Sequence, residues 1–304
     1  MNVLVTGGMG FLGQSLVEML AERGGHVVSY DLRTKESEHP NAVYIKGDIG
    51  DLPTLIETLR DHHIEKIIHT AAISHPVLSR DIPYRTMMTN AVGTINVFEA
   101  ARLLGIKRVV NLSSECAYGN NSELGLVRED ASLNPTTPYG ATKVFTEKMA
   151  YVYSTLYGME VPSLRPGWLY GPGQFEQCYM KTLLRNAIDG VPTKEEAGID
   201  YRFQYVHVTD VARACILAMD TPKLNELVFN ITGGTQISYG ELVSRVKALY
   251  PDADIEIGAG TIDILDANAP FDISRAKEVI GYEPRVQLEE GMRTYAEWLK
   301  NHEF

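Results

Sequence analysis

Residues 3–13 read VLVTGGMGFLG, and this stretch decides the fold. Its first part, Val3–Thr6, is the short aliphatic and β-branched run that is typical of a buried parallel strand. Three glycines follow at positions 7, 10 and 13, where the helical stretch Leu12–Glu22 begins. The first glycine allows a tight turn, the second lets a ligand approach the backbone, and the third lets the helix pack closely on the strand. We therefore expect a strand, a glycine turn and a helix in that order.

The same alternation of strands and helices continues through the first half of the chain. The runs that we interpret as strands are short and rich in β-branched residues; they are Val3–Thr6, His26–Tyr30, Val43–Lys46, Lys66–Thr70, Arg108–Ser113 and Val161–Arg165. The stretches with helical periodicity between them are Leu12–Glu22, Leu52–Asp61, Asn90–Leu104 and Tyr139–Tyr157. Parallel neighbouring strands need a crossover helix, so this order predicts an α/β fold with a doubly wound parallel sheet.

After Pro172 the alternation loosens. We expect one further strand, Leu227–Ile231, and the helices Val208–Met219, Met180–Ile188, Tyr239–Leu249 and Leu288–Lys300. Helices joined by short loops do not extend a parallel sheet. This pattern therefore predicts a smaller C-terminal lobe that is interleaved with the sheet.

Composition and charge exclude several classes of protein. The chain has 304 residues, and its 44% hydrophobic and 22% charged residues are typical of a globular protein of one or two domains. A formal net charge of -11 is opposite to what a general nucleic-acid binder needs. No apolar run reaches the length of a membrane span, and the first residues lack the basic region of a signal peptide. Cys116, Cys178 and Cys215 form no disulfide framework, so we expect a reduced cytoplasm, no nucleic-acid partner and no membrane partner.

The glycine turn and the end of the second strand together predict a dinucleotide site. The N-terminus of the helix Leu12–Glu22 offers N–H groups and a positive dipole end to a pyrophosphate. Asp31 closes the second strand at nearly the spacing of about 20 residues at which an acidic residue binds the adenosine ribose. A carboxylate there favours NAD over NADP. Arg33 keeps NADP open as an alternative, because a nearby arginine can receive the 2′-phosphate.

Two more stretches follow strand ends, where sheets of this kind bind ligands. Asp48 and Ile49 come after the third strand, and we expect them to reach the adenine. Ala71 and Ala72 come after the fourth strand, and their small side chains let a cofactor pass close to the backbone. Asp48 has an alternative role as the N-cap of the helix Leu52–Asp61.

Tyr139 and Lys143 form the candidate catalytic pair. They lie four residues apart in YGATK, so they share one face of a helix. A nearby ammonium favours the phenolate and lowers the tyrosine pKa from about 10 toward neutrality. Such a tyrosine can take the proton of a substrate hydroxyl while the carbon loses hydride. Ser113 and Ser114, in SSECAYG at the end of the fifth strand, are placed to hydrogen-bond the same oxygen.

Together these motifs resemble those of the extended short-chain dehydrogenases/reductases, in the NAD-dependent epimerase/dehydratase group. The resemblance covers nearly the whole chain and rests on TGGMGFLG, GDIGD, HTAA, the N-x-x-GT-x-N-V-FEAAR helix, SSECAYG, YGATK, RPGWLYGP, YVHVTDVARA and YEPRVQLEEGMR. It implies Ser114, Tyr139 and Lys143 as the catalytic set, with Ser114 preferred to Ser113 because the family's Ser or Thr lies four residues before the tyrosine of its VYG motif, here Tyr118. It also implies a tightly held NAD and often a homodimer built from helices 90–104 and 139–157 of each subunit.

The resemblance further implies a Rossmann-type NAD-binding domain at residues 1–166, to which residues 206–232 return, and a substrate-binding lobe at residues 167–205 and 233–304. The cofactor-binding residues that we expect are Gly7, Gly10, Phe11, Leu12, Gly13, Asp31, Leu32, Arg33, Asp48, Ile49, Ala71, Ala72, Asn90, Ser113, Tyr139, Lys143 and Pro166. The substrate-binding residues that we expect, for a small sugar-like molecule, are Ser74, His75, Ser114, Trp168, Gln174 and Arg202. The pair His62-His63 has no further ligand at metal spacing, so we expect no metal site.

Three departures from the family's pattern fall on the substrate side. Trp168 stands where sugar-nucleotide epimerases often have an asparagine that touches the nucleotide-sugar. Arg202 is displaced by one residue from the arginine that grips the diphosphate. The segment at residues 193–196 reads TKEE, and carboxylates near a pyrophosphate repel it. A shifted loop is the alternative explanation for each departure.

Cys116 and Glu115 are candidates for a second acid–base group. Cys116 lies two residues before Tyr118, where dehydratases of the family have a glutamate and some 3,5-epimerases have a cysteine. Glu115 lies where dehydratases have an acidic residue. If the strand stays extended, Ser114 and Cys116 share a face and Glu115 points away. The alternative for Cys116 is a small buried thiol that packs beneath the strand.

The main hypothesis for the function is an NAD-dependent epimerase or dehydratase, which removes hydride from a nucleotide-activated sugar and returns it. The alternative is a net NAD-dependent dehydrogenase of a free sugar, a sugar acid or another small hydroxy compound. A third class, a non-catalytic NAD-sensing or scaffold protein, is disfavoured because Tyr139 and Lys143 are both present.

Overall fold

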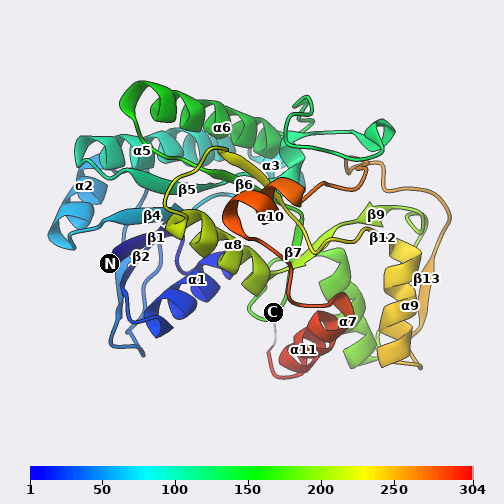
Figure 1. Cartoon of the computed structure of the whole chain (residues 1–304). Helices are drawn as coiled ribbons and strands as arrows, with labels where there is room; N and C mark the ends of the chain where they lie inside the picture. The colour runs from blue at the N-terminus through cyan, green and yellow to red at the C-terminus, as the bar shows by residue number, and fades with distance from the viewer. Residues whose placement is uncertain (303–304) are drawn as a thin grey trace.

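A seven-stranded parallel sheet forms the centre of the molecule in the computed structural model, which describes residues 1–302 (Figure 1). The strand order is β11-β6-β5-β4-β1-β2-β3, and every neighbouring pair runs parallel. The strands are β1 (Asn2–Thr6), β2 (His26–Asp31), β3 (Ala42–Lys46), β4 (Lys66–His69), β5 (Arg108–Leu112), β6 (Ser163–Pro166) and β11 (Val228–Ile231). The expected doubly wound α/β sheet is confirmed.

Two layers of helices cover the sheet (Figure 1). One layer contains α2 (Leu52–Asp61), α5 (Gly93–Leu103) and α6 (Pro138–Tyr157), and the other contains α1 (Phe11–Glu22) and α8 (Val208–Asp220). Helix α1 buries Leu12, Leu16 and Leu20, whose four-residue spacing is the stripe that a helix presents to a core. Thr137 caps α6 by accepting a backbone N–H, and Pro138 begins the helix where its missing N–H is not needed.

The chain winds in opposite directions on the two sides of β1, which has β2 on one side and β4 on the other. In sheets of this kind, ligands bind at the carboxyl ends of the strands beside this point. The loops that follow β1, β2, β4 and β5 all leave this edge. The fold therefore brings together residues near 7–13, 31–33, 70–75 and 113–118.

The helix that we expected at Asn90–Leu104 begins earlier, so this boundary was wrong. Helix α4 (Pro83–Met87) continues directly into the π-helical turn η1 (Met88–Val92) and then into α5. Asn90 lies inside the π-helical turn and is 1% exposed. Its side-chain oxygen accepts the N–H of Ile73 at 2.8 Å, and its amide donates to the carbonyl of Ile73 at 3.0 Å. The π-helical turn thus fixes the loop after β4, and such turns frequently occur at functional sites.

Most of the remaining elements pack around a hydrophobic core of their own, at the right of Figure 1. The expected helices there are confirmed as α7 (Tyr179–Asp189), α9 (Tyr239–Leu249) and α11 (Leu288–Lys300). Three small sheets join β7 (Trp168–Tyr170) to β10 (Tyr205–His207), β9 (Arg202–Phe203) to β12 (Ile237–Ser238), and β8 (Thr193–Glu195) to β13 (Ile255–Ile257). The short helices α3 (Pro76–Asp81), η3 (Ser122–Leu124) and α10 (Ser274–Ile280) complete the fold. The domain boundaries that we expect stay a prediction.

Three findings on residues 1–302 concern the expected environment of the chain. None of their helices has both the length and the apolar character that a membrane span needs. Within the same range, no three His, Cys, Asp or Glu side chains are grouped so that they could hold a metal ion. Cys116, Cys178 and Cys215 are free thiols, and Cys215 lies on the fully buried side of α8.

Candidate active site

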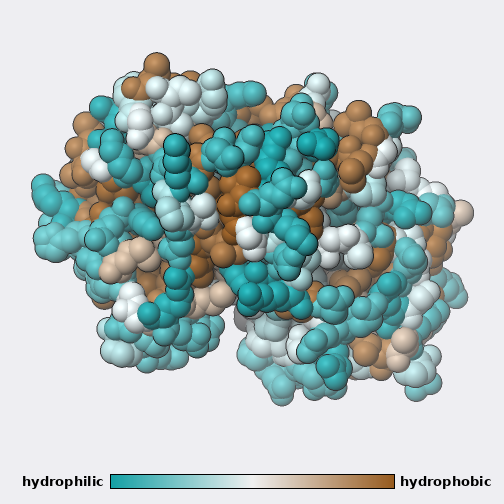
Figure 2. All heavy atoms as spheres, in the orientation of Figure 1, coloured by the Kyte–Doolittle hydropathy of each residue, from teal (hydrophilic) through white to brown (hydrophobic). Residues whose placement is uncertain are grey.

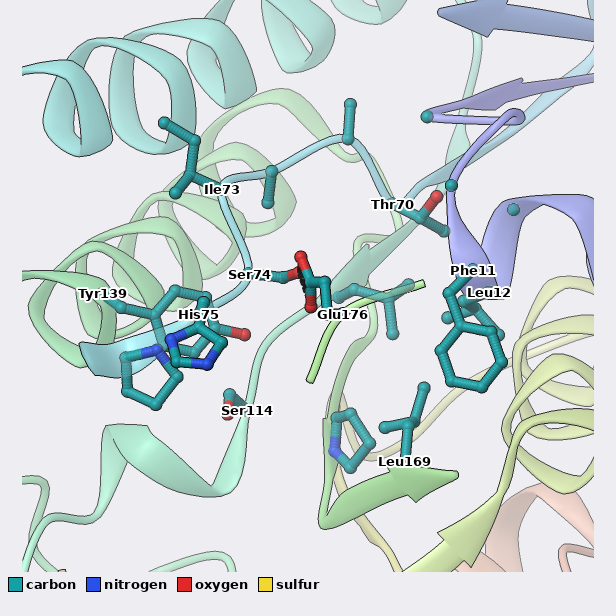
Figure 3. A pocket seen from close by; sticks show the side chains of 18 of the residues that line it. Phe11, Leu12, Thr70, Ile73, Ser74, His75, Ser114, Tyr139, Leu169 and Glu176 are labelled. Carbon is teal, nitrogen blue, oxygen red and sulfur yellow. Dashed lines mark hydrogen bonds between the residues drawn. The ribbon is translucent and has the colours of Figure 1, made fainter. Parts of the chain in front are cut away.

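A cleft of about 860 Å³ opens at the carboxyl ends of the strands and reaches the elements beside the sheet. Its wall contains every expected cofactor-binding residue except Asn90, and every expected substrate-binding residue except Arg202. Figure 3 shows part of this wall, with Phe11 on one side and Tyr139 on the other. The fold therefore collects residues that are far apart in the sequence into one site.

The glycine turn has the shape that a pyrophosphate needs. Gly7 has a φ of 70°, and a Cβ atom at Gly13 would lie 2.0 Å from the carbonyl oxygen of Gly7. A side chain at either position would therefore strain or break the turn. Helix α1 starts directly after Gly10, and no side chain caps its first N–H groups. These groups remain available to phosphate oxygens at the positive end of the helix dipole.

Asp31 is bound to the glycine turn at the end of β2. Its carboxylate accepts the backbone N–H groups of Met9 and Arg33 at 3.1 and 3.0 Å. The Arg33 guanidinium lies 3.7 Å from the same carboxylate and donates to the carbonyl of Met9 at 2.7 Å. Because Arg33 is already engaged by these two groups, the arrangement supports the expected preference of this site for a ribose diol over a 2′-phosphate.

Asp48 lines the cleft but does not cap the following helix. The N-cap of α2 is Asp51, whose carboxylate accepts the N–H of Thr54 at 3.2 Å. The alternative role that we considered for Asp48 was therefore wrong, because the helix begins three residues later in the chain than such a cap requires. Asp48 instead accepts the N–H of Gly50 at 2.7 Å, which shapes the loop after β3.

Ser114, Tyr139 and Lys143 face the cleft together. Tyr139 and Lys143 lie on α6, and the Nζ atom of Lys143 is 5.5 Å from the centre of the Tyr139 ring. The same Nζ atom donates to the carbonyl of Leu112, the last residue of β5, at 2.5 Å. The Ser114 hydroxyl shares a hydrogen bond with the Tyr139 phenol. The end of β5 and one turn of α6 thus position the whole expected catalytic set.

Burial acts on the tyrosine in the direction opposite to the one that we expected. Burial raises the pKa of Tyr139 above its usual value, and the nearby Cys116 adds to this, whereas the hydrogen bond of Ser114 lowers the pKa by less. Burial also lowers the pKa of Lys143 to about 8. The expected low pKa of Tyr139 is therefore wrong for the protein chain by itself, because desolvation raises the phenol pKa by more than the hydrogen bond of Ser114 lowers it.

The chain turns sharply after β5, which changes the expected roles of Glu115 and Cys116. Residues Glu115–Ala117 form the 3₁₀ helix η2, and its N-cap Ser114 accepts the N–H of Cys116 at 3.2 Å. The extended geometry that would have pointed Glu115 away was wrong, and both side chains line the cleft. Burial raises the pKa of Cys116 to about 12 and that of Glu115 to about 8. At neutral pH, Glu115 therefore holds a proton and the Cys116 thiol stays neutral.

The substrate side of the cleft contains Trp168 but not Arg202. Trp168 lies in the wall, on strand β7. Arg202 lies on β9 with an exposed side chain and does not line the cleft, so its expected place in the wall was wrong. Neighbouring residues of a strand point to opposite faces. Phe203 is fully buried, so the displacement of one residue turns Arg202 outward.

Residues 171–178, which we call the strap, contribute residues 174–178 to the wall, and of these only Gln174 was predicted. The Arg33 guanidinium lies over the ring of Phe175, 5.6 Å from its centre. Ser74 donates to the carboxylate of Glu176 at 3.3 Å, and Figure 3 shows these two side chains together in the middle of the wall. The available signal was the Gly-Pro-Gly sequence at residues 171–173, whose two glycines have positive φ angles.

Comparison with known proteins finds relatives along nearly the whole chain. Residues 3–232 match the model of the NAD dependent epimerase/dehydratase family. The chain is 32% identical to the UDP-glucose 4-epimerase of Mycolicibacterium smegmatis, with 99% of both proteins covered. It is 29% identical to the dTDP-glucose 4,6-dehydratase of Streptomyces antibioticus, over 99% of this chain and 93% of that protein. The structure of MoeE5 in complex with UDP-glucuronic acid and NAD matches with a TM-score of 0.90 at 30% identity, over 99% of both chains.

Proposed function

This chain belongs to the NAD-dependent epimerase/dehydratase family, and on that premise we propose that it removes hydride from a hydroxyl-bearing carbon of a nucleotide-activated sugar and returns it. It is an NAD-dependent enzyme of the extended short-chain dehydrogenase/reductase type. The observation that carries the proposal is the continuity of the cleft. One wall extends from the glycine turn, past Ser114, Tyr139 and Lys143, to the strap.

The residues of the cleft fit NAD. The uncapped N–H groups at the start of α1 would hold its pyrophosphate, and Asp31 would hold its adenosine ribose. Ala71 and Ala72 leave room for it beside the end of β4. When bound there, NAD supplies the carbon that takes up a hydride and gives it back.

Tyr139 is the proposed proton acceptor for the substrate hydroxyl. This step needs the deprotonated form of Tyr139, which the positive charges of Lys143 and of bound NAD would favour against the effect of burial. As the sugar carbon loses hydride, the O–H bond of its hydroxyl group breaks, the proton passes to the phenolate oxygen of Tyr139, and a carbonyl group forms. Ser114 holds the same oxygen by a hydrogen bond, and Lys143 supplies the positive charge that stabilises the phenolate. The reverse transfers restore the hydroxyl group. The sugar therefore undergoes no net oxidation, as in a 4-epimerase.

The strap supports this redox-neutral reaction over a net dehydrogenation. Its Phe175 and Glu176 contact Arg33 and Ser74, which belong to the loops after β2 and β4. All four residues line the cleft that fits NAD, so their contacts would hinder exchange of the cofactor with solvent. Slow exchange suits a reaction in which the same cofactor molecule takes the hydride and returns it.

The proposal includes a homodimer that forms through helices 90–104 and 139–157. The surface of these helices exposes large apolar side chains; Leu103 is 53%, Tyr151 is 65% and Leu156 is 70% exposed. Figure 2 shows hydrophobic residues among the hydrophilic ones along the edge that carries α5 and α6. Exposed apolar patches commonly mark protein interfaces, and pairing of these helices between two copies would bury them. A cytoplasmic location also belongs to the proposal, on the basis of the cysteine content of the sequence.

A substrate panel tests the proposed function. The full-length enzyme is incubated with UDP-glucose, UDP-galactose, UDP-glucuronate and dTDP-glucose, and in parallel with free sugars and sugar acids. We expect a nucleotide sugar to be converted without accumulation of NADH, measured by NMR for the product and by absorbance for NADH. Stoichiometric NADH formation with a free sugar or acid, and no conversion of any nucleotide sugar, would contradict the proposal.

A further inference from the structure

A buried ion pair lies behind the catalytic helix. Arg165 on β6 contacts Glu147 on α6 at two points, from Nε to Oε1 at 2.8 Å and from the terminal guanidinium nitrogen to Oε2 at 2.6 Å. The two side chains are only 3% and 4% exposed. A buried ion pair is often no more stable than apolar residues of similar volume. Packing stability alone therefore does not explain why Arg165 and Glu147, rather than apolar residues, are buried here.

The Glu147 carboxylate is also fixed from the end of β5. The hydroxyl of Ser113, the residue before the expected catalytic serine, donates to the same Oε1 atom that Arg165 contacts. Arg165 is in turn held by the carbonyl of Glu129 at 3.0 Å, and its guanidinium lies 4.5 Å from the centre of the Tyr118 ring. The Glu147 carboxylate is thus held from the end of β5 and from β6.

That position is one helical turn after Lys143, on the same face of α6. Lys143 is 7% exposed, and burial alone favours loss of its proton. The negative charge of Glu147 opposes this effect and raises the pKa of Lys143. Glu147 is thus the carboxylate of α6 that favours the charged form of Lys143.

The groups that face Lys143 from other elements do not supply a lasting negative charge. Cys116 of η2 is a neutral thiol, because burial raises its pKa to about 12. His69 of β4 is also neutral, because burial lowers its pKa to about 3. Tyr139 carries a negative charge only at the step in which it has lost its proton. Between turnovers, the charge that keeps the lysine protonated therefore comes from Glu147.

We propose that Glu147 is a positioning residue which, held by Arg165 and Ser113, keeps the buried Lys143 ammonium charged so that it can stabilise the Tyr139 phenolate. The inference rests on the proposed function, in which Lys143 has this role. Glu147 and Arg165 do not line the cleft, so they act on the reaction through Lys143 rather than on the substrate or the cofactor.

The test measures the pH at which Lys143 loses its proton. The full-length protein is treated with a trace of acetic anhydride between about pH 6 and about pH 10, where only neutral amines react, and labelling of each lysine is read by peptide mass spectrometry. We expect Glu147→Gln to lower the midpoint for Lys143 by about one pH unit or more, the usual effect of removing a nearby opposite charge. The exposed Lys148, next in the sequence, is the internal control and should not move. An unmoved midpoint for Lys143 would overturn the inference.

Arg165→Lys is the matched control variant. It loses the two-point contact but keeps the positive charge and the Glu147 carboxylate, to which Ser113 still donates. It should therefore lower the melting temperature as Glu147→Gln does while leaving the Lys143 midpoint in place. An equal fall in both variants would mean that Glu147 acts only on the structure, and would overturn the inference. Should Glu147→Gln fail to fold, the double variant Glu147→Gln/Arg165→Met removes the uncompensated guanidinium and must show the same fall. The labelling needs no substrate, so a failed substrate panel and an unmoved midpoint are separate results.

Discussion

The Lys143 ammonium lies 5.5 Å from the centre of the Tyr139 ring and at the same time donates to the last carbonyl of β5. One side chain thus connects the helix that carries the phenol to the central sheet. Since the same strand end carries Ser114, the two groups that would hold the substrate oxygen are fixed relative to each other by the fold. The acid–base groups are therefore positioned before a substrate binds, and proton transfer requires such positioning.

Replacement of Tyr139 by phenylalanine should abolish turnover and leave NAD binding nearly intact. The phenol is the proposed proton acceptor, whereas the glycine turn and Asp31 hold the cofactor. We expect a loss of about 10²–10⁴-fold in kcat, the usual contribution of a general base. NAD affinity, measured by calorimetry, should stay within about threefold, or ~0.7 kcal/mol. Near-normal turnover would remove Tyr139 from the mechanism.

Lys143→Met should weaken both turnover and NAD binding, since in the family that this chain resembles the lysine also reaches the nicotinamide ribose.

The enzyme should bind NAD more tightly than NADP because of Asp31. Its carboxylate accepts hydrogen bonds from a ribose diol and repels a 2′-phosphate, and Arg33 is held by Asp31 itself. In Asp31→Asn the repulsion is lost and Arg33 is released. The preference for NAD should then fall by about tenfold or more, or ~1.4 kcal/mol. Calorimetry with both cofactors measures the ratio, and equal or tighter NADP binding by the unmodified enzyme would show that Arg33 dominates.

Turnover in deuterated water should place no deuterium on a sugar carbon. If the reaction moves only hydride, Tyr139 handles the sole mobile proton and Cys116 has no chemical role, in agreement with a thiol pKa that burial raises to about 12. Cys116→Ala should accordingly change kcat by less than about threefold, with a modest loss of stability. Mass spectrometry of the product gives the answer. Deuterium that enters with the unmodified enzyme and disappears in Cys116→Ala, with hydride transfer intact, would establish Cys116 as an acid–base group.

Glu115→Gln should stabilise the protein more at pH 8 than at pH 5. Burial raises the pKa of Glu115 from its usual 4.5 to about 8, so the unfolded chain loses this proton at lower pH than the folded chain does. The contribution of Glu115 to stability is therefore complete below about pH 4.5 and declines until about pH 8. A glutamine does not titrate, so the free energy of unfolding of the variant does not fall in this way. The fall in the unmodified protein is on the order of 1 kcal/mol or more. Melting temperatures at the two pH values measure it, and a gain that is equal at both would contradict the assignment.

Leu156→Asp should convert the proposed dimer into a monomer. Leu156 lies on α6 and is 70% exposed in the single chain, and a charge there would have to be buried if α5 and α6 of two copies pair. Ile264→Asp is the matched control, because Ile264 is 49% exposed and lies outside these helices. Size-exclusion chromatography with light scattering reports the mass. A monomeric unmodified protein, or an equal effect of both variants, would exclude this interface.

The central sheet could be predicted from the sequence because its strands and long helices are periodic over many residues. Each strand run from Val3 to Arg165 appeared within a residue or two of its place. The small strands around Trp168 and Arg202 are two or three residues long, and such runs have too little alternation to be recognised. The predicted start of a helix at Asn90 was wrong for a different reason. A π-helical turn depends on packing against the rest of the molecule and leaves no periodic signal.

Most of the cleft wall could be predicted because parallel strands end at one edge of the sheet. Residues that follow those strands, such as Asp31, Ala71 and Ser114, meet there as a consequence of topology. The direction of the Tyr139 pKa could not be predicted, because it depends on how deeply the phenol is buried. The predicted place of Arg202 in the wall was wrong for a similar reason. Which face of a two-residue strand points inward is decided by contacts with distant parts of the chain.

The edge strand β11 pairs with β6, although the ribosome synthesises the whole segment from β7 to α8 after β6 and before β11. At a synthesis rate of about 5–20 residues per second, β6 leaves the ribosome about 3–12 s before its partner. During this interval β6, which lies inside the finished sheet, is the edge of the nascent sheet, and such edges pair readily with other chains. Slowing the ribosome between codons 166 and 228 lengthens this interval and should therefore lower the yield of the protein.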